Sequence, residues 1–337
     1  MPRPPPNNAG DALTRALASF TPDLPLAVAY SGGADSTALL LACVRKWPAQ
    51  VAAIHVHHGL QAAADGFALH CTSTCNELQV PLAVMHVVAH KSKGQSPEDA
   101  ARKARYGALA SAVAQPIGAL RCRSIALAQH ADDQVETMLL ALSRGAGLPG
   151  LAAMRARWDH AGVVYWRPLL LLSAIELRSW LAQQGARFVD DPSNSEAEFT
   201  RNRIRATVLP ALDRTFANVR DTFARSAAHA AQAQRVLDEV AQQDLLQVQS
   251  QPVDGSLRIH NLRGLSRDRQ ANLLRYWLRT VHGATASAAQ LDELLKQLAA
   301  CSTRGHHIEI RAAQGVVQRR AGALAWYNRT GFQALRV

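Results

Sequence analysis

The sequence predicts an α/β protein in which a parallel-sheet, Rossmann-like domain is followed by a smaller C-terminal α+β or helical domain. Between residues 24 and 168, short apolar β-prone runs alternate with longer helical patterns, as in βα units around a parallel sheet. A glycine-rich turn directly follows the first of these runs. Because 337 residues are enough for two average domains, a second domain is expected after the sheet.

Five apolar runs are predicted strands, and the patterns between them are predicted helices. The strands are residues 26–30, 51–56, 82–87, 124–128 and 163–166. The helices are residues 37–46, 66–78, 97–114 and 132–143. Two more helices are expected at residues 173–184 and 200–209, and we expect Gly185 and Pro210 to end them.

A domain boundary is expected near residue 215. Residues 1–20 would be an N-terminal extension, residues 21–215 the parallel-sheet domain and residues 216–337 the C-terminal domain. The last of these starts with a long Ala-, Gln- and Arg-rich helical stretch at 218–249. It continues with predicted helices at 266–281 and 288–300 and with short β-prone runs within 308–326. This order predicts a small α+β module.

The composition excludes several classes of protein. With 48% apolar and 19% charged residues, the chain is not a disordered basic tail. No apolar run approaches the ~18 residues of a membrane helix, and the first ten residues lack the core of a secretory signal. The expected location is the cytoplasm, without a membrane partner. The five cysteines include no Cys-x-x-Cys pair, so reduced core thiols are expected, Cys71 and Cys75 among them.

The net charge of +11 is unevenly distributed along the chain. Residues 1–215 hold 21 basic and 17 acidic side chains, whereas residues 216–337 hold 16 and 9. Most of the basic residues are arginines, which suit contacts with nucleic-acid phosphates. The codon bias of a GC-rich genome gives the same arginine excess, so the charge alone leaves nucleic-acid binding open.

The segment Ser31-Gly32-Gly33-Ala34-Asp35-Ser36 is the sharpest feature of the sequence, between the first predicted strand and an apolar helix. Two glycines let the backbone approach a ligand, and the serine hydroxyls can donate to it. The following helix offers its free N–H groups to an anion. The spacing is neither that of a Walker loop nor that of a Gly-x-Gly-x-x-Gly turn. An ordinary capped Gly-Gly turn is the alternative, and the strand-turn-helix context favours a phosphate site.

A cluster of acids follows the fourth predicted strand. Asp132, Asp133 and Glu136 begin a helix at the carboxyl end of that strand, where open α/β sheets bind ligands. Hard oxygen donors there can hold Mg²⁺ on nucleotide phosphates, and Asp35 would complete the metal site. The alternative is that the acids only favour the helix dipole. His130 stands at the mouth of the same site, where we expect it to contact the ligand.

Two pairs of arginines fall at helical spacing, namely Arg102 with Arg105 and Arg201 with Arg205. Solvated helix faces are the ordinary explanation for such pairs. If the ligands are phosphates, Arg105 and Arg205 are the expected contacts.

The loop at residues 31–36 resembles the SGGxDS loop of the N-type ATP pyrophosphatases, the PP-loop family. That resemblance implies cleavage of ATP between its α- and β-phosphates and adenylation of an oxygen. Three further segments are similar to the tRNA(Ile)-lysidine synthetase family. They are HVHHGL at residues 55–60, HADDQVET with the glycine-rich run after it at residues 130–154, and the stretch at residues 190–210 that contains RNRIR.

The resemblance implies that ATP adenylates the C2 carbonyl oxygen of the wobble cytidine, position 34, in tRNA(Ile) with a CAU anticodon. The ε-amine of free L-lysine then displaces AMP, so that lysidine and diphosphate are formed and the tRNA reads AUA instead of AUG. Residues 216–337 would be a second grip on the tRNA. Some family members carry a further C-terminal domain, for which this chain looks too short.

The resemblance also implies roles for single residues. ATP would be bound by Ser31, Gly32, Gly33, Ala34, Asp35, Ser36, His55 and His130. Mg²⁺ would be held by Asp35, Asp132 and Asp133. Asp35, Asp133, Glu136, Arg105 and Arg205 would act in catalysis. Glu136 would recognise or deprotonate the lysine amine, and the two arginines would contact substrate phosphates.

Three other functions stay open at this point. A tRNA cytidine thiolase shares the loop but relies on Cys-x-x-Cys pairs, which this chain lacks. A small-molecule amide synthetase uses the same adenylation, and the basic C-terminal module argues against it. A nucleotide-binding regulator would not need the acidic cluster. The sequence also leaves open whether the protein is a homodimer and which residues bind lysine.

Overall fold

The computed structural model describes residues 8–57, 64–87, 97–190, 199–249, 255–301 and 306–328. The chain divides into two compact units, residues 1–230 and 231–337. This division falls inside one long helix, α10 (Val219–Val248). The boundary near residue 215 therefore stays a prediction. Among the described helices, none is both long and apolar enough to cross a membrane.

The first unit is built on a six-stranded sheet with the order β3-β2-β1-β4-β6-β5. Its strands are β1 (Leu26–Ala29), β2 (Val51–His57), β3 (Leu82–His86), β4 (Ser124–Ala126), β5 (Arg157–His160) and β6 (Val163–Trp166). All pair in parallel except β5, which runs antiparallel to β6 at the edge. The predicted parallel sheet is thus confirmed. The sequence missed β5 because Arg-Trp-Asp-His has no apolar run.

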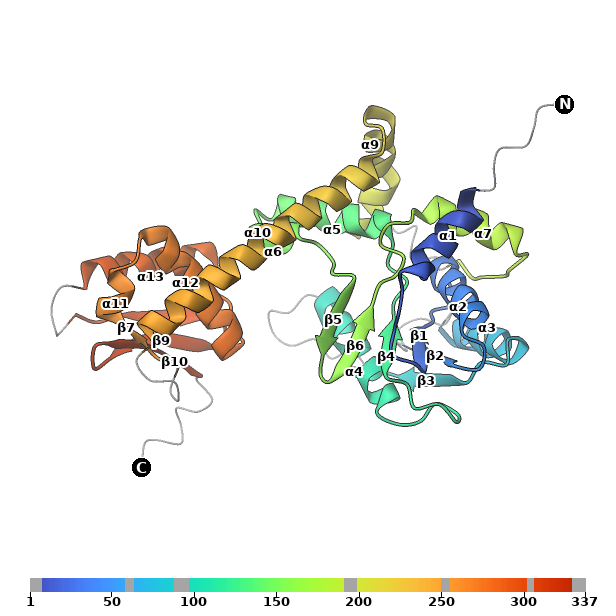
Figure 1. Ribbon diagram of the computed structural model, residues 1–337, viewed down its shortest axis with the longest axis horizontal. Coiled ribbons are helices and arrows are strands. Elements are labelled where there is room, and N and C mark those ends of the chain that lie inside the picture. The colour runs from blue at the N-terminus through green and yellow to red at the C-terminus, as the bar shows by residue number, and fades with distance from the viewer. Residues whose placement is uncertain are drawn as a thin grey trace. The chain divides into compact units, whose positions relative to one another are not determined.

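Helices cover both faces of this sheet. They are α1 (Asn8–Ala18), α2 (Ala34–Lys46), α3 (Ala64–Glu77), α4 (Pro97–Val113) and α7 (Ala174–Gln183). Along β1, Leu26 and Val28 pack with α1, α2, α3 and α7, whereas Ala27 packs on the opposite face with Leu109 of α4. Figure 1 shows α1, α2 and α7 gathered beside the sheet. This alternation follows from the two-residue repeat of a strand.

Helix α1 was not predicted, since the sequence was interpreted as an extension up to residue 20. Leu13, Leu17 and Phe20 are buried in the core beside α2 and α7. Their spacing of three and four residues is that of an amphipathic helix. The Pro- and Asn-rich residues before Gly10 obscured this pattern.

The remaining helices of this unit are α5 (Ala131–Ser143), α6 (Leu148–Leu151), α8 (Thr200–Arg203), the π-helical segment η2 (Ile204–Val208) and α9 (Leu209–Thr215). The prediction that Pro210 ends a helix was wrong. Pro210 lies in the first turn of α9, where a missing N–H is tolerated. Ile204 and Leu209 pack against Val135 of α5, so η2 lies along the helix that carries the acids.

The second unit is an α+β module, as expected. Its four antiparallel strands have the order β7-β10-β9-β8. They are β7 (Leu257–Arg258), β8 (Glu309–Ala312), β9 (Gly315–Arg320) and β10 (Ala323–Asn328). Helices α11 (Ile259–Arg263), α12 (Arg267–His282) and α13 (Ala288–Ala300) pack on them with the last turns of α10. The core centres on Trp277, which is fully buried.

Candidate active site

The two loops singled out by the sequence leave neighbouring strands at one point of the sheet. Strand β1 pairs with β2 on one side and with β4 on the other, so the strand order reverses between β1 and β4. Residues 31–36 follow β1, and residues 127–133 follow β4. Ligands of open α/β sheets bind in the crevice at such a reversal, outside the carboxyl ends of the strands.

The loop after β1 has a conformation that needs glycine at Gly32. Its φ is +84°, and a Cβ there would lie 3.1 Å from Val189 Cγ2 and 3.2 Å from Cys71 Sγ. The N–H of Val189 donates to the Gly32 carbonyl at 3.0 Å. The backbone is therefore held close to its neighbours, and a side chain at this position would require Val189 and Cys71 to shift as well as a left-handed backbone.

Hydroxyl groups hold the same loop against the start of α2. Ser36 Oγ accepts from the N–H of Ser31 at 3.2 Å and donates to the Gly33 carbonyl at 3.0 Å. Thr37 Oγ1 donates to the same carbonyl at 2.9 Å. Gly33 is the N-cap of α2, and no side chain caps this end of the helix. The first N–H groups of α2 thus stay available to an anion, which is the arrangement expected for phosphate binding.

His55 contacts Tyr30, the residue directly before this loop. Its Nδ1 donates to the Tyr30 carbonyl at 3.0 Å and lies 3.4 Å from Cys71 Sγ. Burial lowers the pKa of His55, so the ring is neutral. Cys71 and Cys75 are buried in the core, and burial raises the pKa of both thiols to about 12. Contact of His55 with ATP stays a prediction, and residues 58–60 of its motif lie outside the described residues.

His130 brings the acids of both loops together. Its Nε2 lies 3.4 Å from Asp35 Oδ2 and 3.6 Å from Asp133 Oδ2. Its Nδ1 lies 3.5 Å from Asp132 Oδ2, at the limit of hydrogen bonding, so charge attraction dominates. Burial opposes the protonated ring, but the carboxylates of Asp132 and Asp35 outweigh it and raise the pKa of His130 to about 10. A cationic imidazole thus stands among three carboxylates.

The fourth acid, Glu136, is fully buried and paired with Arg205 of η2. The Nε of Arg205 donates to Glu136 Oε1, and its Nη2 donates to Glu136 Oε2 at 3.2 Å and to Asp133 Oδ1 at 2.8 Å. Arg201 Nη1 lies 3.6 Å from Glu136. Burial raises the pKa of Glu136, and Arg205 counteracts part of that effect. A π-helical turn, which often marks functional sites, places Arg205 here.

Asp132 has partners of its own that the sequence did not reveal. Its Oδ2 accepts from the N–H of Ala174 at 2.8 Å, and its Oδ1 accepts from Arg220 Nε at 2.6 Å. Although burial opposes ionisation, His130 and Arg220 hold the pKa of Asp132 well below its usual range. Arg220 lies 88 residues further along the chain, in a helix with many polar residues. No local sequence pattern marks that contact.

Arg105 belongs to a second cluster, on α4. Its guanidinium lies 5.7 Å from the centre of the Tyr106 ring, and Arg167 donates to the Tyr106 hydroxyl at 3.0 Å. Among the interactions of the described residues, none joins Arg105 to Arg205 or to the acids. The structure thus groups Asp35, Asp132, Asp133, Glu136, His130 and Arg205 in one network and Arg105 in another.

The acids form no complete metal cage by themselves. Within the described ranges, no group of three or more His, Cys, Asp and Glu is arranged to hold an ion. Mg²⁺ commonly takes only one or two carboxylates, with phosphate and water oxygens completing its shell. Asp35 and Asp133 face the same nitrogen and suit that role. Asp132 and Asp133 each accept hydrogen bonds at both oxygens, Asp132 from Ala174 and Arg220, and Asp133 from the His130 N–H and Arg205. A carboxylate oxygen that accepts one hydrogen bond keeps a lone pair for a metal ion, so these bonds exclude neither acid.

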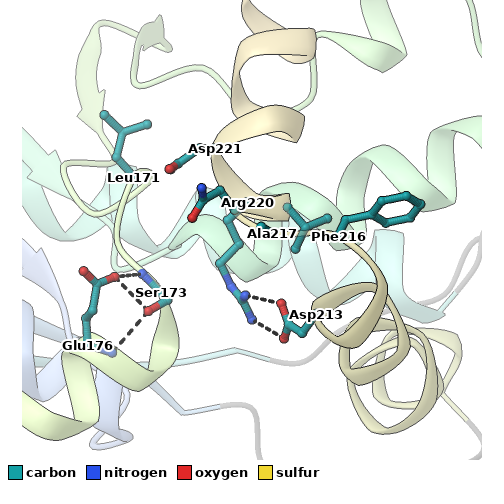
Figure 2. Close-up of a pocket in the computed structure, with 10 residues that line it drawn as sticks. Leu171, Ser173, Glu176, Asp213, Phe216, Ala217, Arg220 and Asp221 are labelled. Carbon is teal, nitrogen blue, oxygen red and sulfur yellow. Dashed lines mark hydrogen bonds and ion pairs between the residues drawn. The ribbon is translucent and has the colours of Figure 1, made fainter.

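Arg220 also lines a pocket of about 300 Å³ in the first unit. Figure 2 shows its guanidinium facing Asp213, to which it donates two hydrogen bonds of 2.6 and 3.1 Å. Ser173 and Glu176, which cap the start of α7, lie across the pocket. Arg220 thus both lines this polar pocket and contacts the buried carboxylate of Asp132.

Two family models match the chain. One, described as a PP-loop domain, matches residues 8–212, and the other, described as the TilS substrate binding domain, matches residues 257–325. A tRNA(Ile)-lysidine synthase of Polaromonas naphthalenivorans (strain CJ2) is 55% identical over 94% of this chain and 93% of its own length. Another, of Burkholderia pseudomallei (strain K96243), is 46% identical over 86% of this chain, which spans 59% of that relative.

Among solved structures, the U34-tRNA thiolase NcsA from Methanococcus maripaludis has a TM-score of 0.56 to the chain. The match covers 66% of this chain and 77% of that one, with 13% sequence identity. At that identity the likeness concerns the fold alone.

Proposed function

Because the chain belongs to the tRNA(Ile)-lysidine synthase family, we propose that it joins free L-lysine to C2 of the wobble cytidine, position 34, of tRNA(Ile) with a CAU anticodon. ATP is consumed and AMP and diphosphate are released, so the codon read changes from AUG to AUA. One observation carries the proposal. The phosphate loop and the acids of α5 meet at the strand-order reversal, with His130 between Asp35 and Asp133.

The PP-loop domain is an ATP-binding domain. In the proposed reaction, the N–H groups of residues 32–36 and the start of α2 hold the phosphates. Mg²⁺ bound by Asp35 and Asp133 would neutralise phosphate charge. His130, cationic beside the same acids, prevents the carboxylates from repelling the nucleotide when no metal ion is bound.

The chemistry proceeds in two displacements. The C2 carbonyl oxygen of the cytidine attacks the α-phosphorus of ATP, the bond to the β-phosphate oxygen breaks, and diphosphate leaves. The ε-amine of lysine then attacks C2, and the bond from C2 to the AMP oxygen breaks. We assign the lysine amine proton to Glu136, a carboxylate whose pKa is raised by burial and which can therefore accept a proton more readily than an exposed one. Arg205, which holds Glu136, and Arg105 are the proposed contacts for developing phosphate charge.

The second unit is proposed to grip the tRNA. It contains the segment that matches the TilS substrate binding domain, and residues 231–337 carry 14 basic against 8 acidic side chains. The anticodon loop presents its cytidine unpaired, so the base is open to adenylation. The proposed reaction needs one chain and is compatible with a homodimer. Because the substrate is a tRNA, the proposal places the protein in the cytoplasm.

A labelled-lysine assay tests this function. Enzyme, ATP and labelled lysine are mixed with a tRNA(Ile) transcript that carries CAU, or with a matched transcript in which uridine replaces the wobble cytidine. Label is expected in the first RNA only, with equal amounts of AMP and diphosphate. Diphosphate release that needs a small acid but no tRNA would overturn the proposal in favour of an amide synthetase.

A further inference from the structure

The first turn of α10 contacts the acidic network of the first unit through one side chain, Arg220. Its Nε lies 2.6 Å and its Nη2 2.5 Å from Asp132 Oδ1. The same guanidinium donates to both oxygens of Asp213. Arg220 therefore bridges a carboxylate of the candidate active site and a second carboxylate at the end of α9.

Asp132 is fixed from three directions by these contacts. Arg220 holds Oδ1, while the N–H of Ala174 at the start of α7 holds Oδ2. The remaining approach to Oδ2 is taken by Nδ1 of His130 at 3.5 Å. Because an imidazole is rigid and planar, fixing its Nδ1 side also fixes where Nε2 points. In this structure Nε2 points between Asp35 and Asp133.

The burial of Asp132 makes the contact with Arg220 energetically important. Its side chain is 8% exposed, against 39% for Asp213. Loss of Arg220 would leave Oδ1 of this buried carboxylate without a hydrogen-bond donor. Asp132 would then be free to turn about its side-chain bonds, and the His130 ring, 3.5 Å from Oδ2, would lose the neighbour that fixes its orientation toward Asp35 and Asp133.

We propose that Arg220 is a positioning residue for the ATP site: it acts through Asp132 and His130 to hold Asp35 and Asp133 in the arrangement that receives the nucleotide. The direct effect of this role is on the affinity for ATP. An effect on the rate of lysidine formation follows only if the proposed function holds. Asp213 orients Arg220 from the exposed side, facing the pocket of Figure 2, and has no contact of its own with His130 among the described interactions.

The first test is ATP affinity, measured by titration calorimetry of the full chain with Mg²⁺ and ATP in the absence of tRNA and lysine. Arg220→Gln is expected to raise the Kd on the order of tenfold, as for loss of a residue that orients a ligand-binding group. Arg225→Gln is the matched control, since Arg225 is an exposed arginine of the same helix. It should leave the Kd within about twofold. An Arg220→Gln protein that melts like the wild type and binds ATP equally well would overturn the proposal.

A double-mutant cycle keeps the test decisive if Arg220→Gln is unstable. Arg220→Lys keeps the charge but loses the paired hydrogen bonds of the guanidinium, and Asp132→Asn keeps the shape of its partner. If Arg220 acts through Asp132, the double variant should lose no more ATP affinity than the weaker-binding single variant. Losses that add would show independent roles and would overturn the proposal.

The lysidine assay then separates this inference from the proposed function. With wild-type activity established, Arg220→Gln should raise KM for ATP and leave KM for tRNA unchanged, whereas a purely structural role would lower the active fraction without that split. If the wild type binds ATP but makes no lysidine, the proposed function fails. The calorimetric result still decides the role of Arg220.

Discussion

The Nε2 of His130 lies 3.4 Å from the carboxylate of Asp35. This contact links the first turn of α2, which contains Asp35, to His130, the residue directly before α5. Asp35 is the first acid of the phosphate loop, and its side chain is 37% exposed. An exposed carboxylate contributes little to the stability of a fold, so replacing Asp35 should cost the fold little.

Asp35→Ala should therefore abolish adenylation without unfolding the protein. Diphosphate release in the presence of tRNA(Ile) should drop by at least ~10²-fold, since the variant loses a proposed nucleotide ligand. Binding of the tRNA, measured by filter retention, should persist. Full activity in this variant would remove Asp35 from the site.

Gly32→Ala should weaken ATP binding through the backbone. The left-handed conformation at φ +84° costs an alanine roughly 1–2 kcal/mol, and its Cβ would also meet Val189 and Cys71 at 3.1 and 3.2 Å. Gly185→Ala is a matched control, since Gly185 has φ +62° and nothing within 4 Å of its Cβ position. Calorimetry should show weakened ATP binding in the first variant only. Equal binding in both would mean that the loop can rearrange.

Arg205→Ala should destabilise the protein, because Glu136 would be left as a buried carboxylate without its main cation. Removing one partner of a buried ion pair typically costs about 3–5 kcal/mol. Arg201→Ala should cost less, since Arg201 lies 3.6 Å from Glu136 and makes the longer contact. Urea unfolding of the two variants measures the difference. If the free energy of unfolding falls equally in both variants, Arg205 is not the residue that stabilises the buried charge of Glu136.

The residues of the candidate site that could be predicted from the sequence are those that lie next to one another in the chain. The loop at residues 31–36 and the acids at residues 132–136 each lie in one short segment beside a predicted strand, so propensity and spacing located them. The partners of Asp132 come from the starts of α7 and α10, far along the chain. Arg220 looks like any other arginine of a polar helix, and only tertiary packing brings it to Asp132.

The same distinction holds for the fold. The five parallel strands are apolar runs and were predicted from the sequence. The edge strand β5 was missed because an edge strand needs no apolar pattern and Arg157, Asp159 and His160 are exposed. The prediction ended a helix at residue 209, because the proline at position 210 was expected to terminate it. In the structure a π-helical turn before it lets the chain start a new helix with proline in the first turn.

His282 should make the second unit less stable in mild acid. Burial lowers the pKa of this ring, which lies 4.7 Å from Trp277 and 5.2 Å from Trp326 between ring centres. The unfolded chain therefore binds the proton more readily than the folded one, and stability falls as the pH drops below about 6.5, the pKa of an unfolded histidine.

The variant His282→Phe isolates this effect. Its ring cannot titrate, and it removes an Nε2 that is buried without a hydrogen-bond partner among the described residues. The melting temperature of the wild type should fall more between about pH 7.5 and about pH 5 than that of the variant. Equal losses would show that His282 is already solvated in the folded protein.

Binding of tRNA by the full chain should depend steeply on salt if the basic excess of residues 216–337 serves to grip RNA. Each phosphate that an arginine neutralises releases counterions, so the logarithm of the affinity should fall linearly with the logarithm of the salt concentration, by ~0.7–0.9 per phosphate.

Replacing Arg311 and Arg320, two exposed arginines of β8 and β9, by glutamine should reduce that slope by about one for each phosphate that is no longer neutralised. Replacing Arg121 and Arg123, two exposed arginines before residue 216, by glutamine gives the comparison for the same loss of charge elsewhere. A slope that is shallow in the wild type and unchanged in the variants would mean that the arginine excess reflects codon usage and not recognition.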